Sequence, residues 1–290
     1  MIFKNHKTSY FILTILLIVA FWIWSFIFSQ VSNNILQVIF FDVGQGDGIF
    51  IETPNNRQIL IDGGPDKSIL EKLSQTMHFY DRRIDLVILT HPHADHVAGL
   101  IETLNYYEVG HIMTSGAEEK TATYQKWRNI IKEKNIPLTI AQAGQRIILE
   151  SGVVLEILWP DQSLIQSLAQ NVNNSSVVVR LVYNQSEFLL TGDIEKEVEQ
   201  RLVSQNQLLE SDILKIAHHG SKSSTSYNFL KAVNPQIAVI SVGQDNRYKH
   251  PHGDILERLK EVLTYRTDRN GDIEILTDGI LFDIVTDNYE

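Results

Sequence analysis

Hydrophobic residues along the chain fall into one long uninterrupted run followed by many short segments. The run covers residues 10–28 (YFILTILLIVAFWIWSFIF) and contains no charged side chain. A membrane-spanning helix needs about 20 apolar residues, so this run is long enough to cross a bilayer. Lys4 and Lys7 precede it, and Trp22 and Trp24 lie near its far end, where indole rings suit the membrane interface. We therefore predict one N-terminal transmembrane helix, which anchors the chain.

The positive charges before this run predict its orientation. Basic residues stay on the cytoplasmic side of a membrane, so residues 1–9 would form a cytoplasmic tail and residues 30–290 an extracytoplasmic part. A cleaved signal peptide is an alternative that would make the protein a secreted one. Its hydrophobic region would be about 7–15 residues long and followed by small residues, and FSQVSNN offers a poor cleavage site. A run without a polar face is also compatible with a buried core helix.

From residue 35 onward, short β-rich runs broken by turn residues give way to strands that alternate with helical stretches. We expect strands at residues 35–43, 48–53, 57–64, 85–90, 153–160, 176–183, 187–193, 236–242, 271–278 and 279–286. We expect helices at residues 66–77, 94–106, 121–135, 194–205, 228–233 and 254–263. No repeat or linker interrupts the pattern. It predicts a single α/β domain over residues 35–286, with sheets covered by helices.

Composition limits the chemistry that this domain can perform. The 290 residues include no Cys, which excludes disulfides, Cys zinc fingers, iron–sulfur clusters and thiol nucleophiles. Any metal must therefore be held by His and carboxylates. The formal net charge is -10, and a surface this acidic does not bind nucleic acid by bulk charge. A phosphate polymer would need a local basic patch or a metal.

The sequence HPHADH follows one of the apolar predicted strands. It places four potential ligands, His91, His93, Asp95 and His96, within six residues. In extended backbone His91 and His93 point to the same side, whereas Asp95 and His96 fall at the start of the next helix and can face a second position. The spacing favours two divalent ions, which at about 3.5–4 Å apart activate water and stabilise both oxygens of an ester displacement. The alternative, a solvated His-rich loop, fits poorly with the preceding apolar strand.

The HPHADH motif resembles that of the metallo-β-lactamase fold hydrolases, whose α/β fold is an αββα sandwich. Asp62 in LIDGG is similar to the family's Asp that supports the ligands, and Asp193 in LLTGD to the carboxylate that bridges both ions. His218 or His219 in KIAHHGS resembles the last His ligand. Because neighbouring side chains alternate in direction, only one of the two should face a given ion. We favour His219, which abuts the glycine turn, and leave His218 open.

One position departs from the family pattern. The family usually supplies a His between the HxHxDH motif and the bridging Asp, and His111 is too early in this chain to match. The matching stretch offers Asn173, Asn174, Ser175 or Ser176, of which we take Asn174 and Ser175 as supporting residues. One ion would then have a weaker, oxygen-rich set of ligands. The resemblance thus implies one or two divalent ions, zinc or manganese.

Longer segments resemble the hydrolase domain of the ComEC family, in which the missing His is typical. They include FFDVGQGDGIFIETPNNRQILIDGG, HPHADHVAGL, NNSSVVVRL, LKIAHHGSKSSTS and ISVGQDNRYKHPHGDILERL, and the resemblance covers residues 38–282. ComEC proteins are competence channels with many membrane helices that import single-stranded DNA. The resemblance implies a nucleic acid substrate, DNA above all, and association with a DNA-uptake channel. With one hydrophobic span, this chain is expected to be a stand-alone hydrolase domain.

Two further segments offer candidate contacts to substrate. Gln45 and Asp47 belong to the turn DVGQGD and are expected at the rim of the metal site; the alternative is a turn with a capping Asp. Ser221 and Lys222 directly follow the two histidines. A Lys with several hydroxyl groups near it suits a phosphate oxygen, although the same residues are typical of an ordinary helix N-cap.

A last candidate segment combines basic, aromatic and imidazole side chains. It comprises Asn246, Arg247, Tyr248, Lys249, His250 and His252. A base can stack on the Tyr, and phosphates can pair with the Arg and the Lys. Either His could act as a general acid or an outer ligand. The alternative is a solvated loop before the next helix.

Together these features predict a membrane-anchored, metal-dependent hydrolase, specifically a phosphodiesterase or nuclease acting on single-stranded DNA. The expected metal ligands are His91, His93, Asp95, His96, Asp193 and one of His218 and His219; Asp95, Lys222, His250 and His252 are the expected catalytic residues. The same scaffold would also suit a hydrolase of a cell-envelope phosphodiester, a lactone or a β-lactam, because a fold does not fix a substrate. A non-catalytic, metal-stabilised module that binds DNA or a partner is the third possibility.

Overall fold

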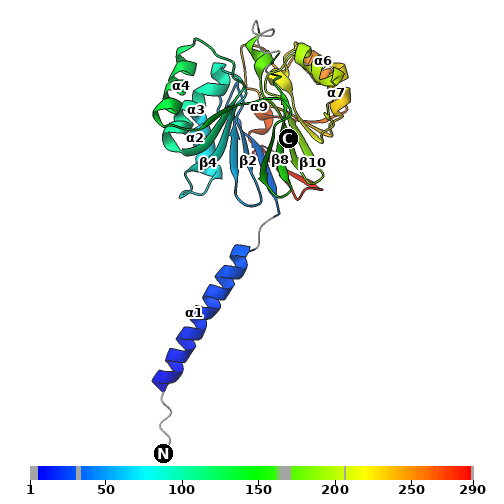
Figure 1. The fold of residues 1–290 in the computed structure, drawn as a ribbon. Helices are drawn as coiled ribbons and strands as arrows, with labels where there is room; N and C mark the ends of the chain where they lie inside the picture. The colour runs from blue at the N-terminus through cyan, green and yellow to red at the C-terminus, as the bar shows by residue number, and fades with distance from the viewer. Residues whose placement is uncertain (1–5, 31–33, 162, 164–170, 206, 289–290) are drawn as a thin grey trace, which may run out of the picture. The chain divides into compact units, whose positions relative to one another are not determined.

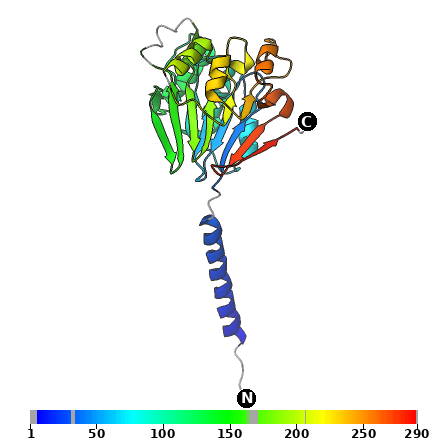
Figure 2. The ribbon, with the colours of Figure 1, turned by 90° about the vertical axis from the view of Figure 1, so that its right-hand side faces the viewer.

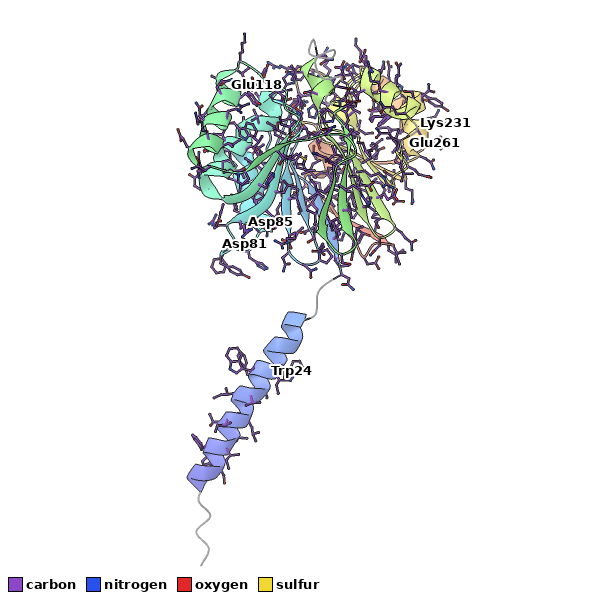
Figure 3. The ribbon with its side chains drawn as sticks, in the orientation of Figure 1. Trp24, Asp81, Asp85, Glu118, Lys231 and Glu261 are labelled. Atoms are coloured by element: carbon purple, nitrogen blue, oxygen red, sulfur yellow. The ribbon has the colours of Figure 1, made fainter. Side chains whose placement is uncertain are left out.

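The computed structural model contains two units, Met1–Asn34 and Ile35–Glu290. It describes residues 6–30, 34–161, 163, 171–205 and 207–288. The first unit holds one helix, α1 (His6–Gln30), whose described side chains from Ser9 to Trp24 are exposed, as Figure 3 shows for Trp24. Among the described residues, no helix has both the length and the apolar character needed to cross a membrane. The helix expected over residues 10–28 lies within α1, and the transmembrane span predicted there is not found among the described residues.

Two β-sheets make up the centre of the second unit. The first has eight strands, in the order β15 (Phe282–Thr286), β14 (Ile273–Thr277), β1 (Leu36–Phe40), β2 (Ile49–Glu52), β3 (Gln58–Ile61), β4 (Arg83–Leu89), β5 (Glu108–Thr114) and β6 (Leu138–Ile140). The second has seven, in the order β13 (Leu263–Arg266), β12 (Ile237–Ile240), β11 (Ile213–Lys215), β10 (Ser186–Leu190), β9 (Val178–Tyr183), β8 (Val153–Trp159) and β7 (Arg146–Glu150). Figure 2 shows the red C-terminal strands beside the blue β1, with which β14 pairs.

Helices cover the outer face of each sheet (Figure 1). The first sheet is covered by α2 (Ser68–Thr76), α3 (Ala94–Tyr106) and α4 (Ala122–Glu133). The second sheet is covered by α6 (Lys196–Ser204), α7 (Tyr227–Val233) and α8 (Gly253–Arg258). Shorter turns are α9 (Thr267–Asn270) and the 3₁₀ segments η1 (Val172–Ser175) and η2 (Ala217–Gly220).

Alternation of apolar side chains along the strands produces three hydrophobic layers. In β1, Val38 and Phe40 face the other sheet, whereas Ile39 packs with the helices on the outside. In β10, Phe188 and Leu190 face inward in the same way. Strands with this period of two bury both faces only when each sheet packs against a partner sheet and a helix layer. The αββα sandwich expected from the sequence is therefore confirmed.

The carboxyl ends of the parallel strands meet at one edge of the sandwich. Strands β3, β4 and β5 run parallel in the first sheet, and β10 to β13 run parallel in the second. Loops that follow such ends are the usual place for ligand sites in α/β folds. The loops after β3, β4, β10, β11 and β12 contain most of the residues singled out in the sequence, whereas Gln45 and Asp47 follow β1 and Asn174 and Ser175 precede β9.

Candidate metal centre

The HPHADH motif connects β4 to α3. His91 follows the strand by two residues, His93 is the residue that precedes the helix, and Asp95 lies in the first helical turn. A carboxylate is stabilised there by the positive end of the helix dipole. His91 and His96 are fully buried, and His93 and Asp95 are partly exposed. The motif is therefore split between a buried pair and a pair at the surface of a cavity.

Glycines let α3 approach the loop after β3 closely. A Cβ atom at Gly99 would lie 1.8 Å from the carbonyl oxygen of Gly63. Instead, the backbone N–H of Gly63 donates to the carbonyl of His96 at 2.8 Å, and that of Gly99 donates to the carbonyl of Gly64 at 3.0 Å. The approach places His96 Nδ1 2.8 Å from Asp62 Oδ2.

Asp62 contacts His96 and Thr90 with both of its carboxylate oxygens. Its two oxygens accept hydrogen bonds from the backbone N–H and the hydroxyl of Thr90 at 2.8 and 2.6 Å, in addition to the contact with His96. Burial raises the pKa of Asp62, and the neighbouring His96 opposes that rise. Because its oxygens are engaged by these donors, Asp62 orients the His96 ring and does not face the cavity.

Four imidazoles converge on a single oxygen of Asp193. The Nε2 atoms of His96 and His219 lie 3.4 Å from Asp193 Oδ2, that of His218 lies 3.9 Å away and that of His91 4.0 Å away. Two donors that each sit about 2.1 Å from a tetrahedral zinc ion are about 3.4 Å apart. The spacing is therefore that of donors around a cation.

Each of these rings has its other nitrogen next to an oxygen, which fixes its orientation. Metal-binding imidazoles in proteins are typically held in this way. The Nδ1 partners are Thr90 Oγ1 and Ser176 Oγ for His91, Asp62 Oδ2 for His96, Glu195 Oε1 for His218 and the Ser241 carbonyl for His219. All four Nε2 atoms are thus directed to the same place.

Several buried polar atoms in this cluster have no hydrogen-bond partner. Among the described residues they include His96 Nε2, His219 Nε2 and Asp193 Oδ1. Buried polar groups are normally paired. Imidazole nitrogens and carboxylate oxygens that lack a hydrogen-bond partner are therefore suited to bind a divalent ion. Two groups with mutually close ligand atoms are His91–His96–Asp193 and Asp95–His96–His219. The residues present therefore fit one or two ions of the kind expected.

Carboxylates beside His96 and His219 favour the protonated form of both imidazoles. Burial lowers the pKa of His219, but the carboxylates of Asp193 and Asp47 more than offset this and raise it to about 10. The pKa of His96 is likewise raised against the effect of burial, chiefly by Asp193. The same histidines hold the pKa of Asp193 well below its usual range, although burial opposes this. Metal binding must therefore displace protons from the two imidazoles.

A buried lysine that sequence reasoning missed also belongs to the site. Lys215, at the end of β11, is fully buried; its Nζ lies 2.5 Å from Asp47 Oδ2 and 3.8 Å from Asp193 Oδ1, and it donates to the carbonyl of Gly192 at 3.1 Å. Asp47 is 1% exposed, so it lies beneath the ligands and not at their rim. The sequence signal that could have revealed Lys215 is a Lys within an apolar segment. Lys is almost never fully buried unless it is paired, so a Lys at such a position indicates a buried acidic partner.

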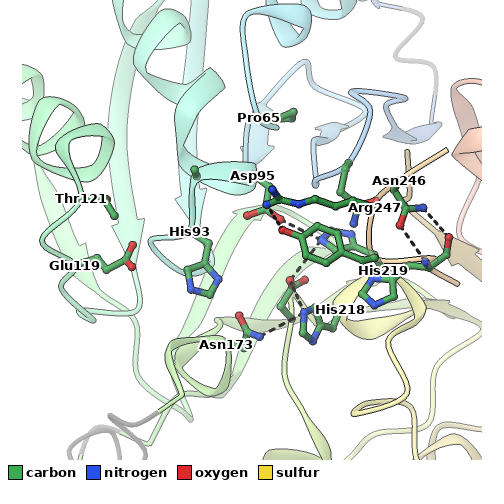
Figure 4. Close-up of a pocket in the computed structure, with 15 residues that line it drawn as sticks. Pro65, His93, Asp95, Glu119, Thr121, Asn173, His218, His219, Asn246 and Arg247 are labelled. Atoms are coloured by element: carbon green, nitrogen blue, oxygen red, sulfur yellow. Dashed lines mark hydrogen bonds and ion pairs between the residues drawn. The ribbon is translucent and has the colours of Figure 1, made fainter. Parts of the chain in front are cut away.

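The cluster lies at the base of a cavity of about 790 Å³ (Figure 4). Of the residues singled out in the sequence, Gln45, His93, Asp95, Asn173, Asp193, His218, His219, Asn246, Arg247, Tyr248 and His250 line it. At its mouth the Arg247 guanidinium lies 4.8 Å from the centre of the Tyr248 ring, which stacks on His250 at 5.6 Å. Asn246 holds its own loop, since its side chain bonds the carbonyls of Gly243 and His250 and the N–H of His250.

Four residues expected to contact substrate or act in catalysis lie elsewhere. Lys222 and Lys249 are exposed and do not line the cavity. Ser221 Oγ is engaged with Ser223 Oγ at 3.0 Å. His252 precedes α8 and does not line the cavity either. The turn after the two histidines directs Ser221 and Lys222 away, because both imidazoles occupy the side that faces Asp193.

The stretch in place of the missing His also differs in detail from expectation. Asn174 accepts a hydrogen bond from the backbone N–H of Glu195 at 2.9 Å, and Ser175 Oγ donates to the carbonyl of Val172 at 2.6 Å. Neither lines the cavity. Asn173 lines it instead, and Ser176 Oγ contacts His91 and accepts from the N–H of Asp193 at 3.0 Å. The tight 3₁₀ turn of η1 rotates alternate side chains away from those expected in an extended segment.

His250 lines the cavity in its neutral form. Burial, followed by the nearby His218, lowers the pKa of His250 to about 4. It therefore carries no extra proton at neutral pH, which disfavours the general-acid role among the roles expected for it.

Comparisons with known proteins agree with this geometry. A model of the metallo-beta-lactamase superfamily matches residues 41–244. The chain is 29% identical over 257 residues to ComE operon protein 3 of Bacillus subtilis (strain 168), covering 82% of this chain and 32% of that protein. It is also 29% identical over 250 residues to competence protein ComA of Neisseria gonorrhoeae, covering 84% and 33%.

The chain thus spans about a third of the length of these two relatives. Among solved structures, the metallo-beta-lactamase fold protein YhfI from Bacillus subtilis superposes with a TM-score of 0.53 at 12% identity, covering 79% of this chain and 95% of that one. That likeness concerns the fold. The matched family model, the ligand cluster and the sandwich agree, and the chain belongs to the metallo-beta-lactamase superfamily, with relatives in the ComEC family.

Proposed function

We propose that this protein is a metal-dependent phosphodiesterase that cleaves nucleic acid, with single-stranded DNA as its substrate. The observation that supports the proposal most is the convergence of four imidazoles on Asp193 Oδ2, beneath an open cavity. Divalent ions in such a site supply the activation of water and the stabilisation of negative charge on the transferring phosphoryl group.

The residues of the chain hold and orient the reacting groups. Asp193 is placed between the imidazoles by the hydrogen bond from its N–H to Ser176 Oγ. Asp95 reaches the cavity from the start of α3, with its Oδ2 3.7 Å from His219 Nε2. Carboxylates that are held in place in this way would need little rearrangement to bind an ion and so to place it beside the substrate.

The cavity mouth supports a nucleic acid over a small neutral substrate. Arg247 can pair with a phosphate, and the ring of Tyr248, 46% exposed, can stack on a base. Arg247 would supply the local positive charge that a phosphate polymer needs on a chain with a net charge of -10. The name of one relative, competence protein ComA, includes the word competence, and a role in DNA uptake is part of the same proposal.

The test is cleavage of a fluorescent single-stranded oligonucleotide by the purified full chain with Mn²⁺ or Zn²⁺. We expect EDTA to abolish cleavage and Asp95→Ala to reduce kcat/KM by about 100-fold or more. Asp283→Ala, at an exposed position on β15, is the matched control and should cleave like the unmodified protein. Undiminished cleavage with EDTA and in Asp95→Ala would remove the metal mechanism.

The same preparation separates the alternatives. Turnover of a cell-envelope phosphodiester, a lactone or a β-lactam without cleavage of DNA would favour another hydrolase on this scaffold. Metal-dependent DNA binding without any turnover would favour a non-catalytic module.

We also propose that the hydrolase unit lies outside the cytoplasm. The support comes from the uncharged residues 10–28 and the preceding Lys4 and Lys7. The full chain, expressed in bacteria, should remain with membranes after alkaline carbonate extraction and be digested by protease added to spheroplasts. Recovery in the medium would indicate cleavage and secretion, and release by carbonate would contradict the anchor.

A further inference from the structure

The stretch between residues 96 and 193 contains no His at the place where the family supplies one, yet a fourth imidazole reaches Asp193. We propose that His218 supplies the missing ligand, so that the adjacent pair divides between two ions: His218 with His91 and His93, and His219 with Asp95 and His96. The inference rests on the proposed metal-dependent function and deepens it by assigning the ligands.

The backbone explains how two neighbouring side chains can face one carboxylate. In an extended strand they would point to opposite sides. His218 and His219 both have left-handed backbone angles, with φ of 51° and 53°, which is uncommon for residues other than glycine. The turn is held by hydrogen bonds from the His218 N–H to the Gly192 carbonyl at 3.2 Å and from the Ser221 N–H to the His218 carbonyl at 2.8 Å. Strain that is retained in this way is typical of functional sites.

The surroundings of His218 are those of a metal ligand. Its Nδ1 lies 3.3 Å from Glu195 Oε1, so a proton on Nδ1 is held by the carboxylate and Nε2 is left for a cation. Glu195 is itself fixed, because it accepts a hydrogen bond from Asn171 Nδ2 at 2.8 Å and its N–H donates to Asn174 Oδ1 at 2.9 Å. Asn174 therefore acts on the site through Glu195.

Asn173 marks the place that the missing His would take. Its Nδ2 lies 3.4 Å from His218 Nε2, and its Oδ1 is buried without a hydrogen-bond partner among the described residues. Figure 4 shows Asn173 and His218 directed toward each other at the base of the cavity. The imidazole thus comes to this place from η2, after β11, instead of from the stretch before β9.

The remaining donors form two neighbouring groups that overlap at His96. His91 Nε2 is 3.0 Å from His93 Nδ1 and shares Asp193 Oδ2 with His218. Ligand atoms of Asp95, His96 and His219 form a second close group, and His96 also lies close to His91 and Asp193. Asp193 lies between the two sets, as a carboxylate that bridges two ions would.

The experiment measures metal binding, independently of any substrate. The full chain and its variants are dialysed against buffered Mn²⁺ or Zn²⁺, and bound metal per chain is determined by mass spectrometry. We expect two ions for the unmodified protein. His218→Asn, chosen because Asn tolerates left-handed backbone, should keep one ion and bind the other at least about tenfold more weakly.

Two further variants make the result specific. Glu195→Gln leaves the ring in place and removes its carboxylate partner, so the same ion should be weakened by about tenfold. Asn173→His in the His218→Asn background should restore the second ion, because it returns an imidazole to the same place. His111→Asn, whose ring bonds Thr139 Oγ1 on the first sheet, is the control and should bind two ions.

Two outcomes would overturn the inference in distinguishable ways. If His218→Asn binds two ions with unchanged affinity, His218 is not a ligand, while metal-dependent hydrolysis stands. If the unmodified protein binds no ion at all, both this inference and the proposed function fail.

Discussion

At the scale of single residues, Lys215 is a buried charge that pairs with buried carboxylates. Its ammonium group is fully buried between Asp47 and Asp193. Burial lowers its pKa, but Asp47 and Asp193 together more than offset this, so the pKa is raised above its usual value and the lysine stays charged. It neutralises part of the buried negative charge without occupying the cavity.

We expect Lys215→Met to lower the free energy of unfolding by about 3–5 kcal/mol, because the change leaves Asp47 buried and unpaired. The measurement is urea unfolding of the metal-free protein. Lys222→Met removes a lysine from an exposed position seven residues away and should change stability by less than about 0.5 kcal/mol. Equal stability of the two variants would show that Lys215 does not hold these carboxylates.

His250 should make the metal-free protein sensitive to acid. Burial and His218 lower its folded pKa to about 4, whereas an unfolded His titrates near 6.5. Between these values the unfolded chain takes up a proton that the folded chain does not, so stability falls as the pH falls. In EDTA, the melting temperature of His250→Gln should therefore fall less between pH 7 and pH 5 than that of the unmodified protein. His78→Gln, at an exposed position, should behave like the unmodified protein; an unchanged slope in His250→Gln would contradict the prediction.

At the scale of elements, the position of α3 depends on the absence of a side chain at Gly99. Gly99→Ala would improve helix propensity by about 1 kcal/mol, but the new Cβ would overlap the Gly63 carbonyl. We expect the steric cost of the overlap to exceed the gain in helix propensity, so that the free energy of unfolding in urea falls by about 1–3 kcal/mol. Metal affinity should weaken as well, because His96 moves away from Asp62.

The neighbouring Ala98→Gly is the control for this helix. It should cost about 1 kcal/mol through propensity alone and leave metal affinity unchanged. A Gly99→Ala variant that is more stable than the unmodified protein would show that α3 can shift at no cost.

Element patterns allowed much of the fold to be predicted from the sequence. Long apolar strands and amphipathic helices, such as β4, β9 and α3, were placed correctly. Strands β5, β6, β7, β11 and β13 and the turn α9 were not among the expected elements. Strand β5 contains Glu108, Gly110 and His111, which break the alternation, and β6 has only three residues. The helix expected over residues 254–263 ends at Arg258, and β13 begins at Leu263.

The candidate site could be predicted only where its residues share a local motif. The HPHADH cluster was visible because its ligands are adjacent in sequence. The pairings of Lys215 with Asp47 and of Glu195 with His218 join segments far apart or depend on left-handed backbone. Neither pairing follows from side-chain periodicity.

At the scale of the whole molecule, the site joins the two sheets. His91 to His96 follow strand β4 of the first sheet, whereas Asp193, His218 and His219 follow strands of the second. A bound ion would therefore stabilise the packing of one sheet on the other.

We expect saturating Mn²⁺ or Zn²⁺ to raise the melting temperature of the full chain. A ligand at 100 times its Kd adds about 2.7 kcal/mol, which corresponds to about 5–10 °C for a domain of this size. EDTA should reverse the shift, and Asp193→Ala should abolish most of it. An identical melting temperature with and without metal, measured by circular dichroism, would contradict a metal shared by both sheets.

The origin of the donors on both sheets also has a consequence for synthesis. On the ribosome, a nascent chain exposes His91 to His96 long before His218 and His219 have been translated. Until then it lacks part of the donor set, and the incomplete polypeptide cannot assemble the full centre.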